Sequence, residues 1–152
     1  MAITAREARQ QILDDLGDAV DRIAVAVACL GEAYEQLSVM AADRLEDELY
    51  RPVQKAYGRG KRTHSQFAER CGLGAREFEA ATAGRSSQGP KAFVERAVAA
   101  ADEGDRLIAD LQDTMLPIES GDAELRAGLS EVRALLDGLP AAAREFLRTL
   151  GR

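Results

Sequence analysis

His64 is the only histidine in the chain, and it is the first residue to test for chemistry. An imidazole can serve as a general base, and the neighbouring Thr63 and Ser65 carry hydroxyl groups. Cys71 lies seven residues further along the expected helix, which is about 10 Å away at 1.5 Å per residue, and no third group is in place to orient the imidazole. We therefore predict that His64 is a core residue on a packed helical face and that the chain holds no catalytic constellation.

Metal and disulfide chemistry need residues that this chain does not bring together. A di-iron bundle uses two Glu-x-x-His pairs, but the residue three before His64 is Lys61. Cys29 and Cys71 are the only cysteines, and the helix pairing expected below places them about 25 Å apart. We predict no metal site, no disulfide and no cofactor.

The middle of the chain carries most of its positive charge. Residues 1–50 have a net charge of −7, residues 51–76 of +6 and residues 77–152 of −5. The segment Gly58–Arg62 superficially resembles a phosphate-binding loop. A Walker A motif, however, needs Gly at the position of Lys55 and Ser or Thr at the position of Arg62. Any electrostatic function should therefore lie in this block, which carries no nucleotide-binding motif.

The basic residues of this block form a stripe. Four of them follow one another at spacings of 4, 4 and 3, which places them on one face of a helix: Arg51, Lys55, Arg59 and Arg62. Together with Lys61 and His64 they are the candidate binding residues for an anionic ligand or an acidic partner. A structural alternative also fits, because the acidic stripe Asp14, Asp18 and Asp21 on the first helix would lie beside the basic one, with Asp21 next to Arg62.

Two amphipathic helices account for the first half of the chain. A capping box at Thr4–Glu7 begins a helix expected over residues 4–41, and its apolar residues recur every three or four positions. A turn within residues 38–43 leads to a second helix over residues 43–72, with Asp43 as its cap and a kink at Pro52. One bent helix continuing to Tyr50 is the alternative. Paired antiparallel, the two helices place Ile23 opposite Gly60, where a large side chain meets a small one.

The second half of the chain predicts a further hairpin. A short helical segment is expected near residues 75–83, followed by a loop over residues 84–89. Helices are then predicted over 90–116, with Pro90 in the first turn, and over 122–150, where Pro140 restarts or kinks the helix. Two hairpins joined by one longer loop predict an all-α, up-down-up-down four-helix bundle, with residues 1–152 forming a single domain.

Composition sets further bounds on the class of protein. Apolar residues make up 46% and charged residues 30% of the chain, as in a folded globular protein. The longest apolar run, Ile23 to Leu30, is far shorter than the roughly 20 residues that span a bilayer. With no secretory leader pattern at Met1–Thr4, we predict a cytoplasmic protein without a membrane span. The excess of arginine over lysine, 17 to 3, suggests a GC-rich bacterial gene.

Three functional hypotheses follow. The first is a non-enzymatic bundle that acts by protein–protein contact or self-association, for which the alanine-rich faces at 97–101 and 141–143 offer flat surfaces. The second is a binder of a small anionic ligand or phosphorylated cofactor through the basic stripe. The third is an enzyme, with His64 as the only place to look. Nucleic acid is disfavoured as a partner, because the chain has a net charge of −6 and only 5% aromatic residues.

Overall fold

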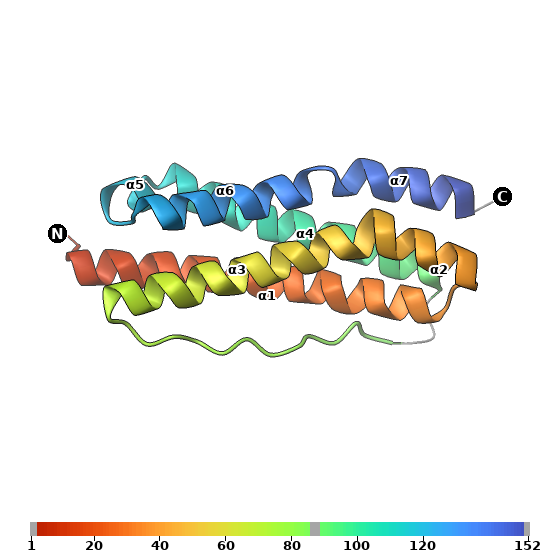
Figure 1. Cartoon of the computed structure of the whole chain (residues 1–152), viewed down its shortest axis with the longest axis horizontal. Helices are drawn as coiled ribbons and strands as arrows, with labels where there is room; N and C mark the ends of the chain where they lie inside the picture. Colours follow the sequence, from red (N-terminus) through yellow and green to blue (C-terminus); the bar gives the residue numbers. More distant parts are fainter. Residues whose placement is uncertain (1–2, 86–88, 151–152) are drawn as a thin grey trace.

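The polypeptide forms helical rods that lie side by side around a shared apolar core (Figure 1). The computed structural model describes residues 3–85 and 89–150. The rods are built from α1 (Ala5–Glu35), α2 (Val39–Leu45), a π-helical turn η1 (Glu46–Tyr50), α3 (Arg51–Cys71), α4 (Pro90–Asp113), α5 (Leu116–Glu119), α6 (Ala123–Asp137) and α7 (Leu139–Leu150). The segments α2, η1 and α3 make one rod and α6 with α7 another, and no strand occurs among the described residues. The predicted all-α four-helix bundle is confirmed.

α1 runs antiparallel to α4. Arg22 of α1 pairs with Glu103 of α4 at 3.5 Å, and Arg9, near the start of α1, donates to the carbonyl oxygen of Ser120, beyond the end of α4. Residue numbers therefore rise along one helix as they fall along the other. Figure 1 shows the same relation between α1 and α3, which pack on each other as predicted.

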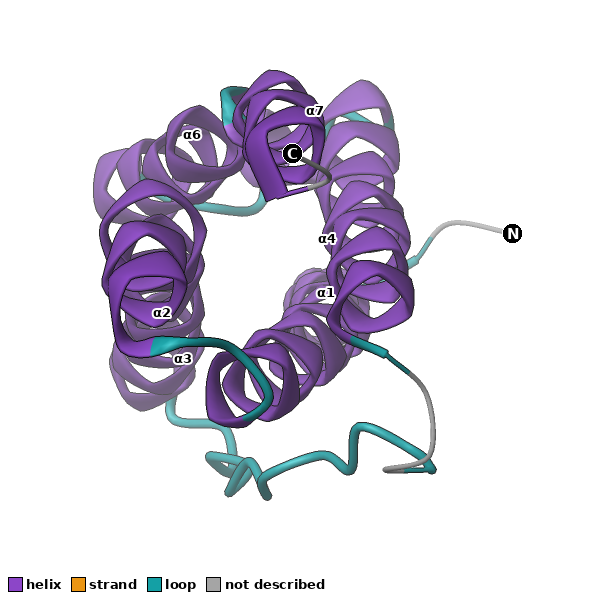
Figure 2. Cartoon of the chain, turned by 90° about the vertical axis from the view of Figure 1, so that its right-hand side faces the viewer, coloured by secondary structure: helices purple, strands orange, loops and turns teal. Residues whose placement is uncertain are grey.

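α6 in turn runs antiparallel to α3. Arg59 pairs with Glu131 at 2.7 Å, and Arg70, at the far end of α3, pairs with Asp122 at 2.7 Å. Since α1 is antiparallel to both α3 and α4, these two helices point in the same direction. The order of the rods is therefore up-down-down-up, with α1 and α6 at opposite corners (Figure 2). The predicted up-down-up-down order is wrong.

One long connection makes this order possible. The crossover segment joins α3 to α4, and its described part from residue 72 to residue 85 runs back along the outer side of the bundle (Figure 1). The connection between Cys71 and Pro90 is eighteen residues long, and a chain of that length can span up to about 60 Å, more than the roughly 36 Å length of the 24-residue α4. The predicted helical segment at 75–83 is absent. These residues are extended, and the side chains of Arg76 and Phe78 contact α1 and α3 respectively.

The crossover segment is fastened to the bundle at both ends of its described part. Arg76 pairs with Asp21 of α1, with both carboxylate oxygens 2.7 Å from Nη2. Near the other end, the carbonyl oxygen of Ala83 accepts from the Arg96 guanidinium and lies 4.0 Å from the Cys29 Sγ. The segment thus crosses the outer face of α1 from the α3 side to the α4 side.

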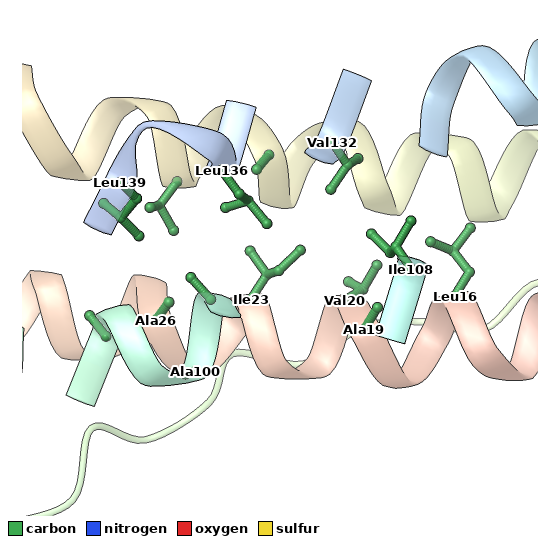
Figure 3. Close-up of a cluster of buried hydrophobic side chains, with 14 of the residues drawn as sticks. Leu16, Ala19, Val20, Ile23, Ala26, Ala100, Ile108, Val132, Leu136 and Leu139 are labelled. Atoms are coloured by element: carbon green, nitrogen blue, oxygen red, sulfur yellow. The ribbon is translucent and has the colours of Figure 1, made fainter. Parts of the chain in front are cut away.

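Glycines let the rods approach closely in the core. A Cβ added to Gly60 of α3 would lie 2.9 Å from Val20 Cγ2, and one added to Gly104 of α4 would lie 3.0 Å from Ile23 Cγ1. The predicted pairing of Ile23 with Gly60 is therefore off by one turn, because Val20 takes that place and Ile23 packs on α4. Figure 3 shows Val20 and Ile23 pointing into the interior toward Val132 of α6.

The turn between α1 and α2 comes earlier in the chain than predicted. α1 ends at Glu35 instead of residue 41, and Val39 rather than Asp43 begins the next helix. Ser38 explains this position, since its Oγ accepts from the Ala41 N–H at 3.3 Å and caps the helix. The capping predicted at Thr4 is confirmed, because its Oγ1 accepts from the N–H of the residue three positions on.

A π-helical turn, Glu46–Tyr50, lies just before Pro52, where the sequence predicts a kink. The Arg51 N–H donates to the Glu46 carbonyl, five residues back, and helical backbone continues from Val39 to Cys71 without a break. A proline ring collides with the carbonyl four residues before it in a regular α-helix. A wider turn just before the proline gives room for the ring without ending the helix.

The later helices end close to where the sequence predicts. α4 stops at Asp113, three residues before the predicted end, because Met115 adopts a left-handed conformation with φ of 69°. Asp122 caps α6 by accepting from the Leu125 N–H at 2.8 Å. The predicted helix 122–150 is divided at Gly138, and Pro140 lies in the first turn of α7, where its missing N–H costs no hydrogen bond.

Candidate binding groove between α3 and α6

Four of the six predicted residues line one groove between α3 and α6. The groove has a volume of about 360 Å³, and its lining residues are Arg51, Gln54, Lys55, Gly58, Arg59 and Arg62 from α3 with Glu131 and Leu135 from α6. The α3 residues share a face because their spacing matches the helical repeat. The α6 wall comes from a segment that the sequence analysis did not include in the site, since only the fold brings α6 beside α3.

Two of the groove's cations are paired. Arg59 donates to Glu131 across the groove at 2.7 Å and also to the Thr63 Oγ1 at 3.2 Å, and its side chain is only 21% exposed. Arg51 pairs with Asp47 of its own rod at 2.9 Å. These contacts hold Arg59 as part of the groove wall and leave Arg51 at the more exposed rim.

Lys55 and Arg62 are the groove's unpaired cations. Both side chains are exposed, and no acidic partner for either occurs among residues 3–85 and 89–150. The Arg62 guanidinium lies over Gly58, since a Cβ added there would be 3.3 Å from its Nη1. Four cations against Glu131 and Asp47 leave an excess of two positive charges in and beside the groove.

Lys61 and His64 lie outside this groove. The Lys61 ammonium sits 4.2 Å from the centre of the Tyr57 ring, a cation–π contact. Burial raises the pKa of Tyr57, and the charges of Asp21 and Arg76 also act on it, which places this pair on the side of α3 that faces α1. The structure therefore divides the predicted set into four groove residues and two residues elsewhere.

His64 is buried between α3, α1 and the crossover segment, as the sequence predicts. It is 3% exposed and meets the ring of Phe78 edge-on, with ring centroids 5.1 Å apart. Burial lowers the pKa of His64, and Arg76 lowers it further, against the opposing effects of the Leu13 carbonyl and Asp14. Its Nδ1 has no hydrogen-bond partner among the described residues, so the neutral imidazole is the form that fits this site.

The hydroxyl and thiol groups near His64 in sequence do not join it in space. The Thr63 Oγ1 donates to the Arg59 carbonyl at 2.8 Å and faces α6, whereas His64 faces Gly17 of α1. Cys71, at the end of α3, is a free, half-buried thiol whose pKa is raised by burial. The arrangement does not orient a nucleophile and a base toward a common point.

The alternative prediction, in which the acidic stripe of α1 neutralises the basic stripe of α3, is wrong about the partner. Asp21 was expected beside Arg62, but it binds Arg76 of the crossover segment instead. The stripe faces α6, where Glu131 is its acidic neighbour. The physical reason is the direction of the α3 face, because Gly60 and His64 are the α3 residues that meet α1, at Val20 and Gly17, whereas the stripe lies on the side that meets α6.

The alanine-rich faces are used inside the bundle. Most of their members are buried in the core: Ala97, Ala100, Ala101 and Ala143. The face at 97–101 is therefore not free for docking, whereas Ala141 of the second segment is exposed and Ala142 is half-buried. Small side chains there serve close packing between α4, α1 and α7.

Other kinds of site were tested on the described residues. Within residues 3–85 and 89–150, no three histidine, cysteine or acidic side chains are grouped so that they could hold a metal ion. The described helices also include none that combines the length and the apolar character needed to cross a membrane. Comparison of the chain with protein-family models, with curated proteins and with solved structures found no match. The chemistry of the groove is thus the feature that points to a function.

Proposed function

We propose that this protein acts by contact, by binding an acidic segment of a protein partner in the groove between α3 and α6. The observation that carries the proposal is the pair Lys55 and Arg62, which lie exposed in one groove without an acidic neighbour. Complementary charge speeds association and selects the partner's orientation, even where each exposed ion pair adds only about 0.2–1 kcal/mol.

The groove suits an acidic helix better than an irregular chain. From Arg51 to Arg62 it follows eleven residues of α3, about 16 Å, which matches three turns of a second helix. Leu135 adds a half-buried apolar surface to the α6 wall. A helix with acidic residues every three or four positions and one apolar residue between them would satisfy both features.

The test uses fluorescein-labelled poly-L-glutamate as the probe and fluorescence anisotropy as the measurement, at low and at high salt. The variant Lys55→Glu/Arg62→Glu should bind about tenfold more weakly or worse, since two ion pairs of roughly 0.7 kcal/mol each correspond to that factor. The matched control is Arg6→Glu/Arg144→Glu, which changes the net charge equally at two exposed arginines outside the groove. Equal weakening in both variants would show a non-specific charge effect and contradict the proposal.

A small polyanion is the second candidate occupant. The groove volume of about 360 Å³ is within the range of small-molecule sites, and Gly58 leaves the helix backbone open beside Arg62. Inorganic pyrophosphate should then raise the thermal midpoint of the unaltered protein and leave that of Lys55→Glu/Arg62→Glu unchanged. A pyrophosphate shift without poly-L-glutamate binding would favour this candidate over the first.

A further inference from the structure

An acidic cleft lies on the side of the bundle opposite the basic groove. It has a volume of about 780 Å³ and is bounded by α1, α4 and the crossover segment. Its charged lining residues are Asp18, Asp21 and Arg22 from α1, Glu79 from the crossover segment, and Glu103 and Arg106 from α4. Four acids against two bases give the cleft an excess of two negative charges. The excess stays at two when the ion-pair partners Arg76 and Asp102 are included, so on the same count it is equal and opposite to that of the groove.

The cations of this cleft are already engaged. Arg22 pairs with Glu103 at 3.5 Å, and Arg106 pairs with Asp102 at 2.9 Å. Asp18 and Glu79 are exposed, and the described part of the chain offers neither of them a basic partner. The cleft therefore presents two unpaired carboxylates, as the groove presents two unpaired cations.

We infer that the acidic partner of the groove is the acidic cleft of a second copy of this chain, so that copies associate head to tail. This inference rests on the function proposed above and names the partner of the same site. α1 with α4 and α3 with α6 form opposite sides of the bundle (Figure 2), so one copy can use its groove and its cleft at the same time. Such a heterologous contact leaves one free surface at each end and extends into a chain or closes into a ring.

The charges also disfavour the symmetric alternatives. A two-fold contact of groove with groove would bring Lys55 and Arg62 against the same residues of the other copy, and cleft with cleft would oppose Asp18 and Glu79 in the same way. Of these three contacts, only that of the groove with the cleft brings positive side chains against negative ones. Apolar surface is present on both sides of this contact, from Leu135 in the groove and from Val25 and Leu107 in the cleft.

The experiment measures association of the unaltered protein and of two charge-reversed variants by sedimentation velocity. The unaltered protein should form species larger than a monomer at low salt, and high salt should dissociate them. The groove variant Lys55→Glu/Arg62→Glu and the cleft variant Asp18→Lys/Glu79→Lys should each associate at least about tenfold more weakly. Arg6→Glu/Arg144→Glu, the control with the same charge change as the groove variant, should associate like the unaltered protein.

Mixing the two variants gives the decisive result. The groove variant keeps a native cleft and the cleft variant keeps a native groove, so an equimolar mixture should regain association that neither variant shows alone. A misfolded variant would not be rescued by the other, and the salt dependence of the unaltered protein is an independent measurement. The expected pattern is loss in each variant and recovery in the mixture.

The outcomes separate this inference from the proposed function. If the unaltered protein stays monomeric at low salt while poly-L-glutamate still binds the groove, self-association is overturned and the groove keeps its function. If the unaltered protein associates and both variants associate equally well, the contact uses other surfaces and the inference is again overturned. If poly-L-glutamate does not bind the unaltered protein, the function proposed for the groove is contradicted.

Discussion

Replacing Gly128 by alanine tests the contact between α3 and α6 on which the groove depends. A Cβ at this position would lie 2.3 Å from the Thr63 Oγ1, 2.6 Å from its Cγ2 and 3.0 Å from its Cβ. The Thr63 Cβ is fixed to the α3 backbone, so side-chain rotation alone cannot clear the contact. The hydroxyl is also held by its hydrogen bond to the Arg59 carbonyl. The two helices must therefore move apart.

The expected size of the effect is a balance of three contributions. Alanine in place of glycine favours a helix by about 1 kcal/mol. Overpacking of a tight contact costs about 1–3 kcal/mol, and disturbing the Thr63 hydrogen bond costs about 1 kcal/mol more. We expect Gly128→Ala to lower the free energy of unfolding by about 1–3 kcal/mol, which is about 2–4 °C in the thermal midpoint per kcal/mol for a chain of this size.

Urea unfolding followed by far-UV circular dichroism measures this change at constant slope. Gly58→Ala is the matched control, because the only atom near its new Cβ is the Arg62 Nη1 at 3.3 Å, the end of a flexible side chain. That variant should be more stable than the unaltered protein by up to about 1 kcal/mol. Adding Thr63→Ala should recover part of the loss in Gly128→Ala, a coupling expected only for residues in contact. If Gly128→Ala were as stable as Gly58→Ala, α3 and α6 would not be neighbours and the up-down-down-up order would be refuted.

Two further predictions concern pH and capping. Burial lowers the pKa of His64, so as the pH falls through the ordinary histidine value of 6.5 the unfolded chain binds the proton before the folded protein does. The free energy of unfolding measured by urea titration should thus be lower at about pH 5.5 than at about pH 7.5. The variant His64→Gln should remove that difference. If the difference stayed the same in the variant, other titrating groups would be its cause. Asp122 accepts from the Leu125 N–H at 2.8 Å and binds Arg70 at 2.7 and 3.0 Å, so Asp122→Ala should lower the free energy of unfolding at neutral pH by about 1–2 kcal/mol. The hydrogen bond from Arg70 lowers the pKa of Asp122, so its contribution should persist down to about the ordinary value of 3.8 and disappear as the pH falls through the lower folded value, which urea titrations down to that range would show.

Local patterns in the sequence were sufficient for the helices themselves. The apolar repeat predicts the long helices, and the predicted cap at Thr4 and proline at the start of α4 lie where the structure has them. These features succeed because a cap or a helical face involves residues within a few positions of one another. The shared face of Arg51, Lys55, Arg59 and Arg62 is predictable for the same reason.

The conformation of the crossover segment was beyond the reach of local patterns. Residues 75–83 have helix-forming composition, yet Arg76 and Phe78 are held extended by Asp21 and His64. Those partners are more than ten residues distant in the chain, and their contacts outweigh a weak local preference. The up-down-up-down order was predicted from two antiparallel hairpins joined by one loop, and it is wrong because the connection is long enough to return along the bundle and start α4 parallel to α3.

The sequence by itself thus determined that this chain is a bundle of amphipathic helices and that its basic residues share one face of α3. Only the tertiary structure decided that this face meets α6 and Glu131 and that an acidic cleft lies on the opposite side of the bundle. The reason is that a helical repeat records which side of a rod is apolar but not which rod covers it. That choice depends on where glycines such as Gly60, Gly104 and Gly128 let two backbones approach and on how far the connecting segment can reach.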